Sequence, residues 1–447
     1  MRNPLLLTVL SCLTYFTDAH PYYNLNKKDE TSDGFIKLVG HKTYGGNSSC
    51  VVGDFLQRRD GSENMIEYDF EFQRYFYSVD VRIGSNGDNV TLLVDTGSSD
   101  MWVMSSAMNG RCNTANSSDL DSDCDFGTFN YNDSSSFHNN ETDFKISYND
   151  GTVAIGVWGY DKVAIEGHPI ADVNFAVVEQ TESEVGVLGI GYPLLESTNN
   201  GNSTRVYENL PMRMKSEGLI KKNTYSIYLN GSDDSDASIV FGGIDHSKYT
   251  GDLTLLPVVS FSREDKSRYF RVAVTLTTMK LLNSNGTQTD LSDGVKYAAL
   301  LDTGSTYSFL PSRLLKSLMS QFPNIQYSKS MGYYLIQCSQ ASSFNLVFDF
   351  QGFNIQVPLA NFLINFVTPR GKIQEWCGIS FQKMSSDDRV ILGDDFMSGV
   401  YTVVDLDDNV IALGLAELDS PDEDIEAITD SIPSATSALL YSETWSP

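Results

Sequence analysis

An Asp-Thr-Gly-Ser tetrapeptide occurs twice in this chain, beginning at Asp95 and at Asp302, and each copy directly follows a short apolar run. Buried strands are typically continuous apolar runs, and a Gly next to a carboxylate lets the chain turn tightly. We therefore expect each Asp at the end of a strand, in a narrow loop. Two such loops facing each other would hold two carboxylates that cannot both ionise, because like charges repel at short range. A pair of this kind supplies one acid and one base.

A second element is repeated in the same order. Val187-Leu188-Gly189 follows the first tetrapeptide and Ile391-Leu392-Gly393 follows the second. The distance from the Asp to this Gly is about 94 residues in the first copy and about 91 in the second. One isolated Asp-Thr-Gly is typical of an ordinary turn, whereas two elements repeated at nearly one spacing predict two related halves of one enzyme.

Further motifs resemble those of the pepsin-like aspartic endopeptidases, from about Tyr75 to about Leu415. The family has a catalytic loop that continues to a Trp, a flap hairpin with a Tyr, a segment that passes between lobes and two closing strands. The matching segments here are 95–102, 146–152, 240–251, 390–394 and 401–405. The resemblance implies an all-β, bilobed fold with the active-site cleft between two related lobes. It also implies that Asp95 and Asp302 are catalytic, and we expect neither a cofactor nor a metal.

The resemblance assigns roles to other residues of these motifs. The serines of both tetrapeptides hydrogen-bond the outer carboxylate oxygens, the threonines bridge the two loops, and Tyr148 closes over a bound peptide with its hydroxyl near Trp102. The alternatives are ordinary turn hydroxyls and a plain strand aromatic. The expected substrate-binding and supporting residues are Thr96, Gly97, Ser98, Trp102, Tyr148, Asp150, Gly151, Thr303, Gly304 and Ser305.

Within the family, the nearest resemblance is to the secreted fungal yapsin-like and candidapepsin-like enzymes. It rests on Tyr-x-Asp-Gly-Thr in the flap, on an Asp-rich loop between Cys112 and Cys124, and on the acidic net charge of −27. An acidic body attracts cationic peptides, and the resemblance suggests that Asp150 faces a substrate Lys or Arg. The alternative is that these charges are a solvated surface. Asn149 stands where the family usually has Gly, and Asn tolerates a left-handed backbone.

Length and composition agree with a large β protein. A chain of 447 residues with 41% hydrophobic residues is too long for one simple domain. Clusters of Gly, Asn, Asp and Ser separate short apolar runs, which indicates a largely antiparallel structure with one short helix at 313–318. We expect an N-terminal lobe with the first catalytic Asp and the flap at 60–245, and a C-terminal lobe with the second Asp at 246–416.

The amino end, residues 1–19, resembles a secretory signal with an apolar stretch and a small-residue cleavage site at Ala19. A membrane anchor is the alternative, but the apolar stretch is short and interrupted. Export would make the Asn-x-Ser/Thr sequons potential glycan sites, of which Asn89 is the least certain because it precedes a strand near the pair. The eight sequons begin at Asn47, Asn89, Asn116, Asn132, Asn140, Asn202, Asn230 and Asn285.

Four of the six cysteines, Cys112, Cys124, Cys338 and Cys377, lie outside the predicted leader. Four cysteines allow three pairings, and the sequence alone does not choose among them. The family resemblance suggests Cys112 with Cys124 and Cys338 with Cys377, one structural bridge in each lobe. A metal site is the rival interpretation, but neither a C-x-x-C motif nor a His cluster accompanies them.

Residues 20–59 are a candidate propeptide that ends at the dibasic pair Arg58-Arg59. This segment carries a net charge of +2, whereas the remainder from Asp60 carries −29. A basic strip facing an acidic body is consistent with a segment that blocks the cleft, as in the resembling family, where lower pH weakens the contact. The alternative is a flexible leader. We expect a zymogen, its own propeptide acting as an intramolecular inhibitor.

The last residues, 417–447, are acidic and then Ser/Thr-rich, a composition that predicts disorder. The late apolar cluster 438–441 is far shorter than a lipid-anchor signal needs. We therefore expect a secreted, extracellular or wall-trapped enzyme without such an anchor. We also expect protein or peptide substrates, no nucleic-acid partner, no stable membrane span and a monomer.

Two other classes of protein remain open. An inactive family member that acts as a binding protein would keep the bilobed fold, but this chain has both aspartates, both glycines and the flap Tyr. A glycoside hydrolase would also use paired carboxylates. Its acids need not lie in repeated Asp-Thr-Gly loops, and aromatic sugar platforms are not recognisable in the sequence.

Overall fold

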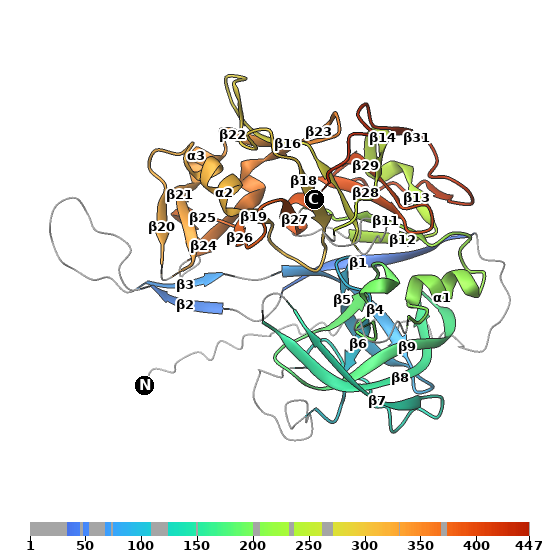
Figure 1. Cartoon of the computed structure of the whole chain (residues 1–447). Helices are drawn as coiled ribbons and strands as arrows, with labels where there is room; N and C mark the ends of the chain where they lie inside the picture. The colour runs from blue at the N-terminus through green and yellow to red at the C-terminus, as the bar shows by residue number, and fades with distance from the viewer. Residues whose placement is uncertain are drawn as a thin grey trace, which may run out of the picture.

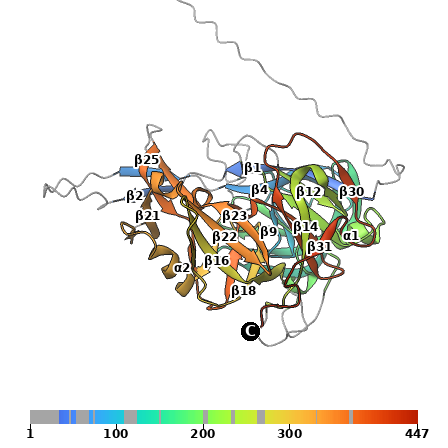
Figure 2. The ribbon, with the colours of Figure 1, turned by 90° about the horizontal axis from the view of Figure 1, so that it is seen from above.

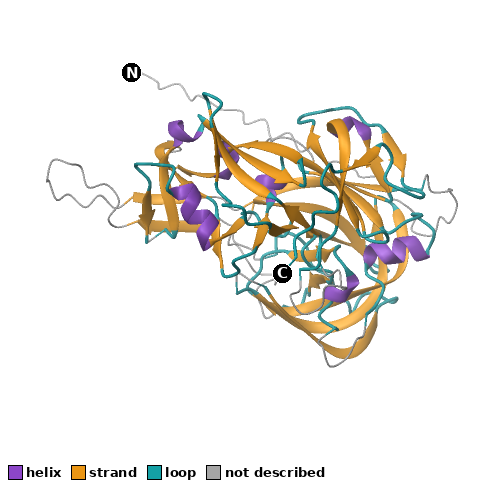
Figure 3. Ribbon diagram, turned by 45° about the horizontal axis from the view of Figure 1, so that its top comes forward, coloured by secondary structure: helices purple, strands orange, loops and turns teal. Residues whose placement is uncertain are grey.

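The computed structural model describes residues 34–44, 48–52, 68–72, 75–108, 124–148, 151–199, 206–231, 237–261, 271–329, 331–367 and 373–446. The predicted signal, 1–19, lies outside these residues, as do Arg58-Arg59, Cys112 and Asp150. Strands make up most of the described chain, and its helices are short (Figure 3). Figure 1 shows the light-blue to green strands of residues 75–181 in one body and the yellow to orange strands of residues 278–384 in another. The expected all-β, bilobed fold is confirmed.

The largest sheet joins both lobes, because strands from the two ends of the chain hydrogen-bond side by side within it. In spatial order it contains β31 (Ala435–Ser437), β14 (Tyr249–Pro257), β29 (Val410–Ala416), β28 (Val400–Asp405), β11 (Thr224–Tyr228), β12 (Ala237–Phe241), β1 (Ile36–Tyr44), β4 (Tyr75–Ile83), β5 (Asp88–Asp95), β10 (Gly186–Gly189), β6 (Met101–Met104), β9 (His168–Thr181), β8 (Val153–Ile165) and β7 (His138–Ser147). The lobe limits at 245 and 246 stay a prediction.

Smaller sheets form most of the C-terminal lobe. One has the order β15 (Ala273–Leu276), β18 (Tyr297–Leu301), β27 (Arg389–Leu392), β19 (Phe309–Pro311) and β26 (Gln382–Met384). A second has β17 (Gln288–Asp290), β16 (Thr278–Asn283), β22 (Phe344–Phe350) and β23 (Phe353–Pro358). A third has β2 (Ser48–Val52), β3 (Tyr68–Phe72), β24 (Leu363–Val367), β25 (Ile373–Ile379), β21 (Tyr333–Gln337) and β20 (Gln326–Ser328), and β13 (Gly243–Asp245) pairs with β30 (Ile425–Ala427).

The helix expected at 313–318 is present as α2 (Ser312–Met319). Its leucines recur at helical spacing, so that one face, including Leu314, Leu315 and Leu318, is buried against the lobe. The other helices are α1 (Leu210–Ser216), α3 (Cys338–Ala341) and α4 (Asp394–Met397), with the 3-10 turns η1 (Pro193–Leu195), η2 (His246–Lys248) and η3 (Leu359–Phe362). Among the described residues, no helix has the length and apolarity needed to cross a membrane.

Strand β1 belongs to the predicted propeptide and lies inside the large sheet. It pairs antiparallel with β12, where Ile36 is opposite Phe241, and with β4, where His41 is opposite Ser78. Ile36 and Leu38 are buried, as expected for alternate residues of a strand with one face on the core. This part of the segment is therefore an ordered strand and not a flexible leader.

The prediction that 417–447 is disordered is wrong for the described residues 417–446. Strand β30 pairs with β13 and strand β31 with β14, at the end of the molecule that holds β12 and β14 (Figure 2). Ile428, Ile432 and Trp445 are buried. These few apolar residues are spaced so that each packs against the folded protein. The prediction of disorder used the average composition of the tail, to which they contribute little because acidic and hydroxyl residues surround them.

The Cys338–Cys377 bridge is present, with the two Cα atoms 5.2 Å apart. Cys124 is also disulfide-bonded, and because Cys112 lies outside the described residues, its pairing with Cys124 stays a prediction. The sequons at Asn89, Asn132, Asn140 and Asn285 are exposed, whereas the one at Asn230 is buried. A buried Asn230 side chain is a poor acceptor for a glycan on the folded protein.

Candidate active site

Two parallel strand pairs position the two aspartates. β5 runs beside β10, with Asp95 opposite Gly189, and β18 runs beside β27, with Leu301 opposite Leu392. The main-chain carbonyl of Asp95 accepts from Ile190 at 2.9 Å, and the main-chain N–H of Asp302 donates to Leu392 at 2.9 Å. The repeated spacing in the sequence therefore corresponds to the same strand pairing in each lobe.

The glycines at the ends of β10 and β27 allow each tetrapeptide loop to pass over its neighbouring strand. A Cβ atom on Gly189 would lie 2.7 Å from the main-chain nitrogen of Asp100, and one on Gly393 would lie 2.3 Å from the carbonyl oxygen of Ser305. Real Cβ atoms do not approach backbone atoms so closely. These close contacts explain why the second repeated element ends in Gly.

The two carboxyl groups face each other across the lobes. A Cβ atom on Gly97 would lie 2.5 Å from Oδ1 of Asp302, and one on Gly304 would lie 2.4 Å from Oδ1 of Asp95. Each carboxyl group thus lies directly against the glycine of the opposite tetrapeptide. The side chains of both aspartates are almost fully buried. Close, shielded carboxyl groups of this kind share a proton more readily than they both ionise.

Each carboxyl group is held by its own loop. Oδ1 of Asp95 accepts from the main-chain N–H of Gly97 at 2.7 Å, and Oδ2 accepts from the hydroxyl of Ser98. In the second loop, Gly304 donates to Oδ1 of Asp302 at 3.1 Å and Ser305 donates to Oδ2 at 2.9 Å. In both tetrapeptide loops the Gly N–H and the Ser hydroxyl donate to the Asp carboxyl group. The two carboxyl groups are therefore held in equivalent orientations.

The threonines connect the two loops. Thr96 Oγ1 donates to the carbonyl of Leu301 at 2.7 Å and accepts from the main-chain N–H of Thr303 at 3.1 Å. Thr303 Oγ1 donates to the carbonyl of Val94 at 2.8 Å and accepts from the N–H of Thr96 at 3.2 Å. Both threonines are buried, so these four bonds are shielded from water. They keep the lobes in register below the carboxyl pair.

Burial raises the pKa of Asp302 well above its usual range, and the charge of Asp95 raises it further. The Ser305 hydroxyl and Arg271 act in the opposite direction. A carboxyl group with a raised pKa stays protonated when its partner is ionised, which is the state that a paired acid and base require.

Arg271 is a further residue near the pair that the motifs do not reveal. Its Nη1 donates to the carbonyl of Gly97, and its charge interacts with both Asp302 and Asp95. Burial lowers the pKa of this guanidinium, and the two aspartates oppose that effect. Arg271 stands outside every repeated element, so only its place in the folded chain identifies it.

Asp394 and Asp395 are two more carboxyl groups that lie close to the pair. Burial raises the pKa of Asp394 well above its usual value, with further contributions from Asp395 and Asp302. Burial also raises the pKa of Asp395 to about 6, although the hydroxyls of Ser308 and Ser380 donate to it. The sequence does distinguish Asp394. It follows Gly393 of the second repeat, whereas the equivalent residue of the first repeat, after Gly189, is the apolar Ile190.

The flap is the turn between β7 and β8. Tyr148 donates its N–H to the carbonyl of Thr152 at 2.9 Å, and Gly151 donates to the carbonyl of Tyr148 at 3.1 Å. The Tyr148 hydroxyl accepts from Nε1 of Trp102 at 2.7 Å. Because Trp102 is in β6, which follows the first tetrapeptide loop, this bond connects the flap to the segment next to that loop. Asp150 lies outside the described residues.

The described residues contain no cluster of three or more His, Cys, Asp or Glu side chains suited to a metal. Two aspartates in mirrored loops, with one flap over them, have the arrangement expected of enzymes that use an acid and a base together.

Comparison with known proteins agrees with this geometry. Residues 76–417 match the family described as "Eukaryotic aspartyl protease". This chain belongs to the pepsin-like aspartic proteases. It is 35% identical to "Aspartic proteinase 3" of Saccharomyces cerevisiae, over 94% of this chain and 84% of that protein.

Two other relatives of the aspartic protease come from yeasts. "Aspartic proteinase yapsin-3" of Saccharomyces cerevisiae is 34% identical over 92% of this chain and 78% of its own length. "Candidapepsin-3" of Candida albicans is 34% identical over 90% of this chain and 94% of its own length. The expected resemblance to yapsin-like and candidapepsin-like fungal enzymes is confirmed, and the protein is an aspartic endopeptidase.

Proposed function

We propose that this aspartic protease is a secreted enzyme, made as a zymogen, that cleaves peptide bonds of proteins at acid pH with Asp95 and Asp302 as its catalytic pair. The observation that carries the assignment of the pair is the mirrored approach of each carboxyl group to the glycine of the opposite loop. The ionised carboxylate takes a proton from a water molecule as the water attacks the scissile carbonyl, and the protonated one donates to the carbonyl oxygen. No covalent enzyme intermediate is needed.

Hydrolysis of a peptide at acid pH by the processed wild type and by Asp95→Asn and Asp302→Asn tests the pair. Loss of one acid or base should lower kcat by at least about a hundredfold. A statine-type transition-state analogue should inhibit the wild type. Undiminished hydrolysis by either variant would refute the assignment.

The position of β1 supports the zymogen proposal. This strand fills a place between β12 and β4, and Lys42 on it lies over the Tyr75 ring with its Nζ 4.3 Å from the centroid. Lys37 pairs with Glu423 of the tail. Removal of 20–59 would take this strand and its cations from the sheet, so activation would require rearrangement of the gap between β12 and β4. Amino-terminal sequencing of the secreted enzyme should find a start after Arg59, and a start at His20 or beyond Tyr75 would contradict the proposal.

The Cys338–Cys377 bridge and the exposed sequons support passage through an oxidising secretory route. Treatment of the secreted protein with an endoglycosidase should lower its mass, with glycans on some of Asn89, Asn132, Asn140 and Asn285 and none on Asn230. Detection of a glycan on Asn230 in folded protein, or of the enzyme only inside cells, would count against this route.

Selectivity for basic residues rests on the acidic body and on Asp150 in the flap. The test is a survey of cleavage sites in a mixed peptide library, compared between wild type and Asp150→Asn. Cuts next to Lys or Arg that become less frequent in the variant would support the proposal. Cuts clustered after bulky apolar residues in both enzymes would reject it.

A further inference from the structure

Backbone pairing places Arg271 beside the second catalytic loop. In the antiparallel pair of β15 and β18, Ala273 is opposite Leu300, and the main-chain N–H of Leu301 donates to the carbonyl of Val272 at 2.9 Å. Arg271 directly precedes Val272, and Asp302 directly follows Leu301, so this contact brings Arg271 to the start of the second tetrapeptide. The position of this arginine is therefore tied to the second tetrapeptide by the main-chain bond of its neighbour, Val272.

The side chain of Arg271 crosses from the C-terminal lobe to the N-terminal lobe. Its Nη1 donates to the carbonyl of Gly97, the same residue whose Cα lies against the carboxyl group of Asp302. The guanidinium is largely buried and its charge interacts with Asp302 and Asp95. A cation in a poorly solvated site acts strongly on nearby carboxylates, since little water screens it.

Other charged or titratable groups also face the pair. Asp394 interacts with Asp302, Asp95 and Asp395, and its raised pKa makes it an uncharged neighbour under acid conditions. Tyr225, on β11, is fully buried and interacts with Asp95. Lys42 acts on Asp394 from β1. Because Lys42 lies in the predicted propeptide, Arg271 is the cation of this group that a processed enzyme retains.

We propose that Arg271 is a positioning residue of the catalytic pair: it holds the carbonyl of Gly97 and supplies the positive charge that keeps one of the two aspartates ionised in acid. This inference rests on the assignment of Asp95 and Asp302 as the catalytic pair. The working state of the pair carries one negative charge, which a neighbouring cation stabilises relative to the uncharged state. The cation also favours the doubly ionised state, so it lowers both apparent pKa values of the pair.

The test compares three substitutions in the processed enzyme by measuring kcat/KM across pH. Arg271→Gln keeps a donor for Gly97 without the charge, Arg271→Lys keeps a charge and a donor, and Arg271→Met has neither. If the charge matters, both limbs of the profile should move to higher pH in the Gln and Met variants, by about one unit, because opposite charges at this range shift carboxyl pKa values by about 1–3 units. The Lys variant should keep limbs close to those of the wild type. Arg313→Gln, at an exposed arginine whose ion pair is with Asp293, is the control and should leave the profile unchanged.

Each outcome separates the inference from the assignment on which it rests. A wild type with a bell-shaped acid profile whose limbs do not move in Arg271→Gln would overturn the role of Arg271 while leaving the catalytic pair intact. A lower KM in the Gln and Met variants with unmoved limbs would likewise overturn it, because Arg271 would then compete with substrate for the Gly97 carbonyl. Should the Met variant fail to fold, the Gln variant alone decides. Full activity in Asp95→Asn or Asp302→Asn would instead remove the catalytic pair itself.

Discussion

At the residue scale, neither Gly97 nor Gly304 has the positive φ that favours glycine, yet neither has room for a methyl group. We expected glycine there because the turn is tight. The structure gives a different reason, since the space that a Cβ atom would take is occupied by the carboxyl group of the opposite lobe. Glycine was thus correctly expected beside the pair. The reason for it, however, is a contact between the two halves of the chain.

Gly97→Ala should therefore lower kcat by about a hundredfold, because displacement of a catalytic group by about 1 Å has an effect of that size. Gly399→Ala is the matched control, as its new Cβ atom would lie 3.6 Å from its nearest neighbour. Steady-state kinetics of the two processed variants test this expectation. Equal activity in both would show that the lobes separate easily at this contact.

Glu196 should make the protein less stable as the pH rises. Burial raises the pKa of this carboxyl group to about 8, with a contribution from Asp100. A folded-state pKa above the unfolded value means that the stabilising contribution is complete below about pH 4.5 and is lost as the pH rises to about 8. Glu196→Gln should therefore reduce the fall in the free energy of unfolding between about pH 5 and pH 8, by roughly a few kcal/mol.

Denaturant unfolding of the wild type and Glu196→Gln across this pH range provides the measurement. Glu182→Gln, at an exposed glutamate, should retain the wild-type dependence. An identical fall in all three proteins would mean that Glu196 ionises without cost in the folded state. Asp302 and Asp394 also have raised pKa values, so some fall is expected to remain in the variant.

At the scale of elements, a hydrogen bond joins the flap to β6, which follows the first tetrapeptide loop. Tyr148→Phe removes the hydroxyl that accepts from Trp102. Because a net hydrogen bond contributes about 0.5–1.5 kcal/mol, kcat/KM should fall between about twofold and tenfold. Trp102→Phe should have a similar effect, and the double variant should be no worse than either single one. Additive losses in that cycle would show that the two side chains act separately.

The C-terminal tail is a second element whose role is structural. Ile428 is fully buried in a cluster with Ile244 of β13 and Leu253 of β14, whereas Leu439 is 86% exposed. Ile428→Ala should lower the free energy of unfolding by about 2–5 kcal/mol, the cost of removing buried methyl groups and leaving a cavity. Leu439→Ala should change it by about 0.5 kcal/mol or less. Equal stability of the two variants would indicate that the tail unfolds independently.

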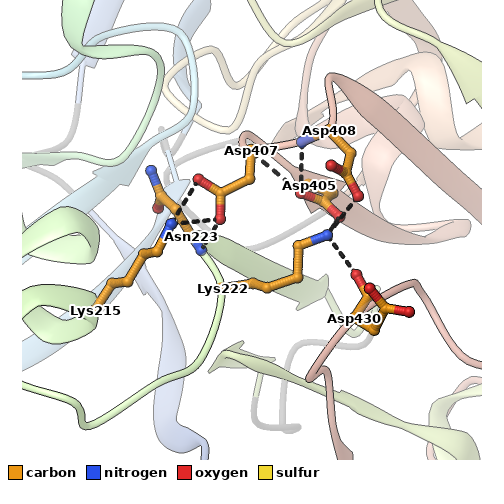
Figure 4. A network of polar contacts seen from close by, with 7 residues as sticks. All are labelled: Lys215, Lys222, Asn223, Asp405, Asp407, Asp408 and Asp430. Carbon is orange, nitrogen blue, oxygen red and sulfur yellow. Dashed lines mark hydrogen bonds and ion pairs between the residues drawn. The ribbon is translucent and has the colours of Figure 1, made fainter.

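At the scale of the whole molecule, charged side chains join segments that are far apart in sequence. Lys222 donates to Asp405 at 2.6 Å, to Asp408 at 2.5 Å and to the carbonyl of Asp430 at 2.5 Å (Figure 4). Nearby, Lys215 at the end of α1 pairs with Asp407 at 2.8 Å. The two clusters connect the segment after α1 to the turn between β28 and β29 and to the tail.

These two lysines should differ in their effect on stability. The Lys222 side chain is 11% exposed and that of Asp405 is 1% exposed, so Lys222→Met leaves a buried carboxylate without its cation. We expect a loss of about 3–5 kcal/mol. Lys215→Met breaks a pair whose side chains are 42% and 30% exposed and should cost about 1 kcal/mol or less. Thermal or denaturant unfolding of both variants measures the difference, and a smaller loss for Lys222 than for Lys215 would refute it.

The sequence by itself was sufficient to predict the family, the β-rich two-lobed fold and the two aspartates, because short local patterns carried that information and occurred twice. The tertiary structure decided what depends on distant contacts. Arg271 reaches the pair through contacts with residues far away in the sequence, and the acidic tail is ordered because a few apolar residues meet a surface formed elsewhere in the chain. Local composition records neither kind of contact, since both depend on which segments the fold brings together.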